Sequence, residues 1–282
     1  MNFEPRFTTL VDVLEYSVKT FGPRDAFGTK TRGRWGWVTY AEFGSMVDRL
    51  RAGLAALGIA RGDAVAIVSN NRIEWAVTAY ACYGVGAALV PMYEAQSPKE
   101  WEFIVRDCEA KALIVANEAA LAKARGLLDT VPSLRHIVVI EGAGAAEGPV
   151  VTYGSLLDSG KTVDSIRPAP SDMAALIYTS GTTGNPKGVI LTHANIASNV
   201  SAAHEVFPMD RADRSLSFLP WAHVFGQTAE LHALLSAGAS IAICEGVDKI
   251  LENLAEVKPT LLFSVPRIFN KIYAGVKAQL AT

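Results

Sequence analysis

The chain has 282 residues, of which 50% are hydrophobic, and a net charge of −2. This composition excludes an intrinsically disordered protein, and the near-neutral charge gives no electrostatic basis for binding nucleic acid. The three cysteines, Cys82, Cys108 and Cys244, are odd in number and lack metal-ligand spacing, which predicts reduced thiols and a cytoplasmic location.

The first half of the chain alternates predicted helices and strands. Thr39 and Glu42 form a capping box that starts an apolar-periodic helix, and Gly58 ends it. We then expect strands over 64–68, 87–90, 113–116 and 137–140, with helices from about 72, over 97–107 and over 118–128. Such alternation with short loops predicts an α/β fold with stacked, mostly parallel sheets covered by helices on both faces.

One uncharged stretch, 75–93, is long enough to cross a membrane. It contains Gly84, Gly86 and Pro91, which interrupt a continuous spanning helix. A helix that ends near Gly84 and is followed by a buried strand therefore explains this stretch better.

An exposed loop is expected over 141–149, where no large apolar residue occurs before Pro149. A second run of elements follows it. The predicted strands are 174–178, 188–192, 216–219, 240–244 and 261–263, and the predicted helices are 193–206, 227–235, 249–257 and 265–280.

The loop between strands 174–178 and 188–192 is rich in glycine and hydroxyl side chains, and Lys187 adds a positive charge. Glycine lets backbone N–H groups approach an anion closely, so the loop predicts a phosphate-binding site. It differs from a P-loop because Gly188, not serine or threonine, follows Lys187, and because a strand follows the loop. The alternative is a hairpin that binds nothing.

A second candidate stretch runs from Ser217 to Gly226. Pro220 ends a predicted strand, and open α/β sheets bind ligands beyond the carboxyl ends of their strands. His223 lies between Trp221 and Phe225, which predicts an apolar pocket with one polar group. The alternative is a histidine with a structural role only.

Taken together, the two stretches resemble the signature loop and the second motif of the adenylate-forming (AMP-binding) family, which includes acyl-CoA synthetases, luciferases and adenylation domains of peptide synthetases. The stretch 265–273 looks like the corresponding part of long-chain fatty acyl-CoA synthetases. Relatives that adenylate amino acids carry an aspartate beside the second motif, whereas 221–229 contains no acid here. The resemblance therefore favours an uncharged acyl tail.

The resemblance implies ATP-dependent activation of a fatty acid to acyl-AMP and then acyl-CoA, with ATP, Mg²⁺ and coenzyme A. It implies catalytic roles for Lys187 and His223. It assigns the acyl site to Trp221, His223, Phe225 and Gly226, and Mg²⁺ to Thr182. It assigns nucleotide phosphate binding to Thr179, Ser180, Gly181, Thr182, Thr183, Gly184 and Lys187.

The same resemblance implies one sheet subdomain over about 60–200 and a second over about 8–58 plus 205–282. The family's later motifs and its small C-terminal domain, with a catalytic lysine, are missing. We therefore expect an incomplete part of an enzyme that is inactive alone. Adenylation of an aryl or short-chain acid, a non-catalytic nucleotide-binding module and a scaffold remain alternatives. Acyl chain length, oligomeric state and peripheral contact with a membrane stay open.

Overall fold

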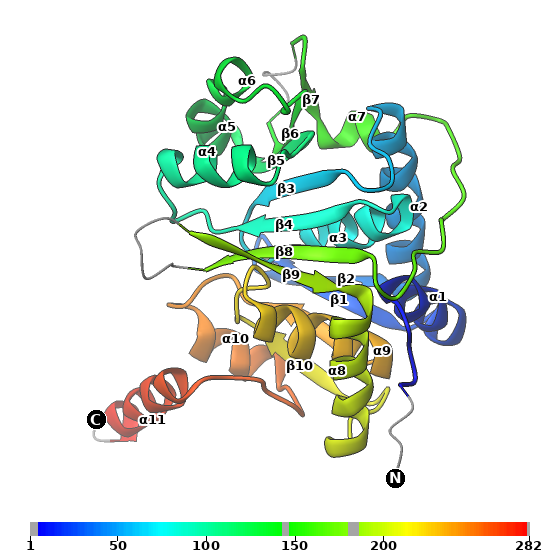
Figure 1. Cartoon of the computed structure of the whole chain (residues 1–282). Helices are drawn as coiled ribbons and strands as arrows, with labels where there is room; N and C mark the ends of the chain where they lie inside the picture. Colours follow the sequence, from blue (N-terminus) through cyan, green and yellow to red (C-terminus); the bar gives the residue numbers. More distant parts are fainter. Residues whose placement is uncertain (1–4, 143–146, 180–185, 281–282) are drawn as a thin grey trace.

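The computed structural model describes residues 5–142, 147–179 and 186–280, and these residues build two β-sheets with helices on both sides of each (Figure 1). The helices are α1 (Leu10–Phe21), α2 (Tyr40–Ala56), α3 (Ile73–Val85), α4 (Pro98–Asp107), α5 (Glu118–Ala124), α6 (Leu127–Thr130), α7 (Tyr153–Leu157), α8 (His193–Val206), the π-helix η1 (Gly226–Ala233), α9 (Leu234–Ala237), α10 (Ile250–Val257) and α11 (Pro266–Leu280).

The larger sheet has the strand order β7-β6-β5-β3-β4-β8-β9. All neighbouring strands in it are parallel except β8 and β9, which form an antiparallel hairpin. The strands are β3 (Ala64–Val68), β4 (Ala88–Met92), β5 (Ala112–Asn117), β6 (His136–Glu141), β7 (Val150–Thr152), β8 (Met173–Thr179) and β9 (Lys187–Thr192).

The smaller sheet has the order β10-β11-β1-β2 and joins two parts of the chain about 200 residues apart. Strand β11 is parallel to β10 and to β1, whereas β1 and β2 are antiparallel. The strands are β1 (Asp25–Thr31), β2 (Arg34–Thr39), β10 (Arg214–Ser217) and β11 (Ser240–Ile243).

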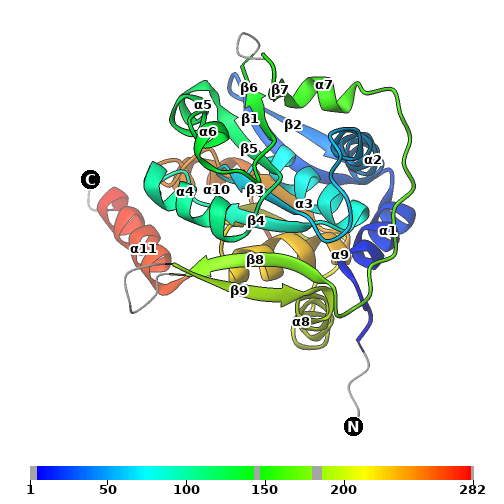
Figure 2. The same ribbon diagram turned by 45° about the horizontal axis from the view of Figure 1, so that its top comes forward.

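Helix α3 lies in the largest apolar core, which contacts both sheets. Every residue from Trp75 to Val85 is buried, because the helix is apolar on all sides and is covered on all sides. Separate cores pack α4 and α5 on the outer face of the larger sheet and α10 on the outer face of the smaller one. Helix α11 projects away from this body in both views (Figures 1 and 2).

The expected α/β class, the mostly parallel sheets and the capping box of Thr39 and Glu42 are confirmed. The stretch 75–93 is a buried helix and strand, and no helix among the described residues is long and apolar enough to cross a membrane. The predicted helix over 118–128 is divided at Gly126, a poor helix former, into α5 and α6.

Two predicted strands were placed wrongly. Strand β10 ends at Ser217, two residues early, because the Leu219 carbonyl accepts a hydrogen bond from the Asn71 side chain. The segment 261–263 makes only a single bridge, from Leu261 to Ser215, in the described structure. The elements that the sequence did not predict are α1, β1, β2, β7 and α7.

Candidate functional site

The stem of the predicted phosphate-binding loop is a regular hairpin. Thr179 is paired with Lys187 across β8 and β9, and both residues are exposed. One residue earlier, the buried Tyr178 donates a hydrogen bond from its hydroxyl to Asp107 Oδ2 at 2.5 Å, which ties β8 to the end of α4. The stem therefore has a fixed position at the carboxyl end of β8. The predicted phosphate-binding residues Ser180, Gly181, Thr182, Thr183 and Gly184 lie outside the described residues.

The segment after β10 is held by Asn71, which follows β3 in the other sheet. The Asn71 side-chain amide donates to Leu219 O at 2.7 Å and to Ser217 Oγ at 3.3 Å, and its oxygen accepts from Trp221 N at 2.9 Å. One side chain thus satisfies three polar groups of a strand end that has left its sheet. The two sheets are joined at their carboxyl ends by this residue.

The Trp221 side chain lies in the core. It is fully buried, and its ring packs against Trp75 at 5.7 Å and against Phe27 at 6.0 Å between ring centroids. We expected Trp221 at the border of an acyl pocket; in this structure its indole packs between α3 and β1. The aromatic pattern of the motif did not reveal that Trp221 anchors the segment.

His223 and Phe225 have the opposite environment, because both are exposed. His223 Nδ1 accepts a hydrogen bond from Phe225 N at 3.2 Å, so the neutral ring carries its proton on Nε2. The Phe225 ring packs edge-on against Phe263, 6.5 Å away between centroids. The sharp turn requires glycine at Gly226, since a Cβ there would lie 2.4 Å from Pro220 O.

The π-helix η1, a rare element that often occurs at functional sites, begins directly after Phe225. It buries Glu230, whose Oε2 accepts a hydrogen bond from Ser217 Oγ at 2.5 Å. Burial raises the pKa of Glu230 to about 8, although the Ser217 hydroxyl partly opposes the shift. Glu230 is therefore a neutral acid near pH 7 and can donate as well as accept.

The same helix places His232 at the centre of the core. His232 Nδ1 lies 2.8 Å from the Tyr80 hydroxyl, and burial lowers the pKa of His232 to about 3. His193 is also buried, accepts from Leu10 N at 3.3 Å and has its pKa lowered by burial to about 4. Both histidines are neutral hydrogen-bonding residues of the core.

A pocket of about 330 Å³ lies between the carboxyl ends of four strands, two from each sheet. The lining residues that follow the strands of the larger sheet are polar, whereas those that follow the strands of the smaller sheet are mostly apolar but include Ser217 and Glu245. The lining residues are Ser69, Asn70, Asn71, Tyr93, Ser217, Phe218, Pro220, Ala222, Cys244, Glu245, Gly246 and Val247. Open α/β sheets bind ligands at this position, and β4 is the direct neighbour of β8, which carries the hairpin stem.

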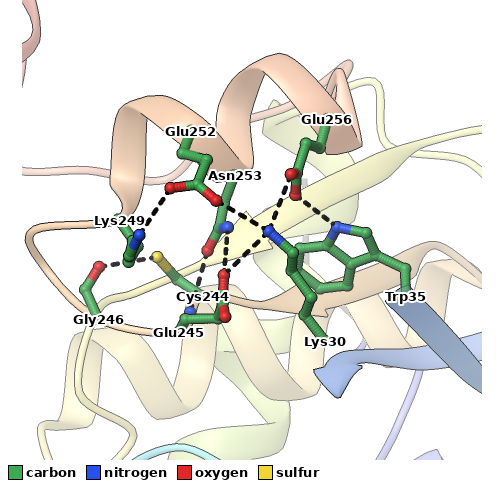
Figure 3. A network of polar contacts seen from close by, with 9 residues as sticks. All are labelled: Lys30, Trp35, Cys244, Glu245, Gly246, Lys249, Glu252, Asn253 and Glu256. Carbon is green, nitrogen blue, oxygen red and sulfur yellow. Dashed lines mark hydrogen bonds and ion pairs between the residues drawn. The ribbon is translucent and has the colours of Figure 1, made fainter. Parts of the chain in front are cut away.

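One wall of this pocket, Cys244–Val247, is supported by a polar network (Figure 3). Asn253 donates to Glu245 Oε2 at 2.8 Å and accepts from Glu245 N at 3.0 Å. Lys30 of β1 lies between Glu245, Glu252 and Glu256, which raise its pKa. Within the part of the chain that the structure describes, no group of three or more His, Cys, Asp or Glu residues could hold a metal ion.

Asn71, Glu230 and Lys30 were not predicted as site residues from the sequence. For Asn71 a signal existed, because it follows a buried strand and so had to lie at the carboxyl edge of the sheet. The burial of Glu230 and the pairing of Lys30 depend on contacts with distant segments, which no local pattern encodes.

In the comparison with known proteins, the similar sequences include acyl-CoA synthetases and ligases of long-chain fatty acids. Long chain acyl-CoA synthetase 6, peroxisomal, of Arabidopsis thaliana is 34% identical over 96% of this chain and 41% of its own length. A long-chain-fatty-acid–CoA ligase of Mycobacterium bovis is 35% identical over 88% of this chain and 42% of its own length. The chain therefore spans about two fifths of the length of these relatives.

The solved structures agree in fold. A long-chain-fatty-acid-CoA ligase from Archaeoglobus fulgidus superposes with a TM-score of 0.84 at 23% identity, over 98% of this chain and 55% of that one. The profile of the family described as AMP-binding enzyme matches residues 14–281, almost the whole chain. With the hairpin stem and the strand-end pocket in the arrangement described above, the chain belongs to the family of AMP-binding enzymes.

Proposed function

We propose that this chain is part of an enzyme that uses ATP to activate a fatty acid, first to acyl-AMP and then to acyl-CoA. The observation that carries the proposal is the position of Thr179 and Lys187 at the carboxyl end of β8, next to the edge that forms the pocket. Similarity to acyl-CoA synthetases and ligases of long-chain fatty acids supports the choice of substrate.

The hairpin suits a triphosphate. Thr179 offers an exposed hydroxyl and Lys187 an exposed positive charge at the two ends of a glycine-rich loop. These groups would bind the β- and γ-phosphates, which leave as pyrophosphate when the carboxylate attacks the α-phosphate. The loop residues Ser180, Gly181, Thr182, Thr183 and Gly184 would add backbone and hydroxyl donors. Bound Mg²⁺, held in part by Thr182, would neutralise phosphate charge.

The segment after β10 suits the acid. His223 is exposed with its Nε2 proton directed away from the local Nδ1 hydrogen bond, and can donate to a carboxylate oxygen. Phe225 and Gly226 would border the acyl tail. Trp221 would act indirectly, because its buried ring fixes the backbone that carries His223.

The proposal also covers the division into subdomains and the cellular compartment. The two sheets would be the cores of two subdomains, over about 60–200 and over 8–58 plus 205–282. The described structure contains three free cysteines, which supports a reducing compartment such as the cytoplasm.

The test uses the full-length gene product with MgATP, coenzyme A and a panel of long-chain, short-chain and aryl acids. We expect acyl-AMP and acyl-CoA by mass spectrometry, with the highest kcat/KM for long-chain acids. Preference for an aryl or short-chain acid would overturn the substrate assignment. ATP binding without acyl-AMP from any acid would indicate a non-catalytic nucleotide-binding module.

The 282-residue chain alone should form no acyl-CoA, since it spans about two fifths of the length of the acyl-CoA synthetases and ligases that it resembles. Binding of the phosphates alone does not align the carboxylate for in-line attack on the α-phosphate. Such alignment supplies much of the rate enhancement of an enzyme. Acyl-CoA formation by the purified chain at ordinary enzymatic rates, with full-length enzyme excluded, would contradict this expectation.

A further inference from the structure

Lys30 is an unusually enclosed lysine. Its side chain is only 6% exposed, and its Nζ lies 2.8 Å from Glu256, 3.0 Å from Glu252 and 3.3 Å from Glu245. Trp35 Nε1 donates to the second oxygen of Glu256 at 2.9 Å, which orients that carboxylate (Figure 3). One cation on β1 thus joins α10 to the loop after β11.

Glu245 is the member of this network that reaches the pocket. Glu245 belongs to the Cys244–Val247 wall, and its side chain turns toward Lys30 and Asn253 (Figure 3). Asn253 is fully buried and contacts both the carboxylate and the backbone N–H of Glu245, which fixes the residue at two points. Lys30 and Asn253, which hold Glu245, are not among the residues that line the pocket.

We propose that Lys30 and Asn253 are positioning residues, which hold Glu245 and thereby fix the Cys244–Val247 loop as a wall of the strand-end pocket. Loss of Lys30 leaves three carboxylates near one another, and their mutual repulsion moves the loop, because Glu245 lies on a loop without the backbone hydrogen bonds of a helix. Glu252 and Glu256 are held on α10.

The consequence for substrates rests on the proposed function. The wall lines the same pocket as Phe218, Pro220 and Ala222, and it begins beside them, because Cys244 N donates to Ser217 O at 2.9 Å. The segment with these three residues leads directly to His223. A displaced wall should therefore weaken binding of the acid, whereas the hairpin of β8 and β9 that would bind ATP phosphates is not part of the network.

Cys244 provides a direct probe of the wall that needs no substrate. Its Sγ donates to Gly246 O at 3.2 Å, and the residue is half-buried. Cys108, also half-buried, lies at the end of α4 on the other sheet and serves as an internal control. We expect Lys30→Met to raise the rate of Cys244 alkylation by iodoacetamide about three- to tenfold, with Cys108 unchanged. Peptide mass spectrometry of the full-length gene product measures both rates.

Lys249→Met is the matched control. Lys249 also pairs with Glu252, at 2.8 Å, but its side chain is 47% exposed and no ion pair joins it to Glu245. Glu256→Gln removes a partner of Lys30 without touching the wall. In both variants Cys244 should be alkylated at the wild-type rate. Lys30→Arg keeps the positive charge and should also show the wild-type rate.

If Lys30→Met does not fold, Glu245→Gln replaces it. This variant loses the ion pair but keeps an acceptor for Asn253, so Cys244 should react faster than in the wild type by a smaller factor. An unchanged Cys244 rate in the folded variant overturns the proposal. So does an equal rise at Cys244 and Cys108, or an equal rise in Lys249→Met.

The substrate arm uses the same variants in steady-state kinetics. Lys30→Met should raise KM for the acid about three- to tenfold with KM for ATP unchanged, and Lys30→Arg should reverse the effect. An increase in both KM values would contradict a wall on the acid side. If the wild type activates no acid, the proposed function fails, while the Cys244 rates still decide whether Lys30 positions the wall.

Discussion

The hairpin of β8 and β9 and the segment from Ser217 to Glu230 both lie at the carboxyl ends of strands. They differ in the contacts that hold them there. The hairpin is joined to the larger sheet through the pairing of β8 with β4, and at its end Thr179 lies opposite Lys187 while Tyr178 is bonded to Asp107. Its second strand is largely exposed, as Ile190 at 63% shows. The other segment is held by Asn71 and by the buried Trp221 and Glu230.

This difference predicts how each region responds to mutation. Removing an exposed side chain of the hairpin, such as Lys187, should change ligand binding with little loss of stability, because few packing contacts are lost. In the Ser217–Glu230 segment, stability and activity should change together at buried positions and separately at exposed ones. The predictions below test that division, beginning with the largest expected effect.

Trp221→Ala should cost about 3–5 kcal/mol of unfolding free energy, the usual cost of deleting a large buried aromatic side chain. Phe225→Ala is the matched comparison within the same motif, because its ring is 43% exposed; it should cost less than about 1 kcal/mol. Denaturant unfolding measures both. Equal losses would show that Trp221 is not the anchor of the segment.

Glu230→Gln tests the buried acid through the pH dependence of stability. The pKa of Glu230 is about 8 in the folded protein against 4.5 for an ordinary glutamate. Between these values the unfolded chain releases a proton that the folded chain keeps, so the contribution of Glu230 is fully present below pH 4.5 and is lost as pH rises through 8. The slope approaches about 1.4 kcal/mol per pH unit within this window.

Glutamine does not titrate, so the wild type should lose stability relative to Glu230→Gln between about pH 4.5 and 8 and then stay level. Denaturant unfolding at a series of pH values measures the difference. Glu205→Gln, at an exposed position on α8, is the control and should run parallel to the wild type. A parallel curve for Glu230→Gln as well would mean that Glu230 is ionised in the folded protein.

Lys187→Ala sharpens the hairpin side of the comparison. In the full-length gene product it should slow ATP–pyrophosphate exchange by a factor that corresponds to about 1.5–3 kcal/mol, the contribution of one charge-assisted hydrogen bond. The melting temperature should stay the same, since the residue is exposed. Exchange at the wild-type rate would remove Lys187 from the proposed phosphate site, and a fall in melting temperature as the sole effect would give it a structural role.

The features that could be predicted from the sequence are those that depend on residues close together in the chain. The hairpin stem, the capping box of Thr39 and Glu42 and the bounds of α8 follow from short-range patterns, and all three are confirmed. Strands β1 and β2 were not predicted, because polar residues and glycines interrupt their alternation and β1 is completed by pairing with β11. Their stability is a long-range property.

The candidate site shows the same limit at the level of single residues. Trp221 and Phe225 are two aromatic residues four positions apart, and nothing local distinguishes the buried one from the exposed one. The distinction arises because Asn71 draws Trp221 N toward the other sheet, beside Trp75, while the turn at Gly226 leaves Phe225 outside. The position of Trp221 therefore depends on partners from α3 and from the loop after β3, which are distant in the sequence.

His223 should show the smallest effect, about three- to tenfold on turnover of the acid with ATP affinity unchanged. Two atoms of its ring could be responsible. Nδ1 accepts from Phe225 N and so shapes the turn, whereas Nε2 is the atom that would meet the carboxylate. His223→Ala removes both, but His223→Asn keeps an acceptor near the position of Nδ1, because asparagine readily accepts from the backbone two residues on.

Steady-state kinetics of the two variants in the full-length gene product, with melting temperatures for each, separates the roles. If Nε2 acts on the substrate, both variants lose acid turnover equally. If His223 only holds the turn, asparagine restores turnover, and the acid site must then be sought among the other residues that line the strand-end pocket.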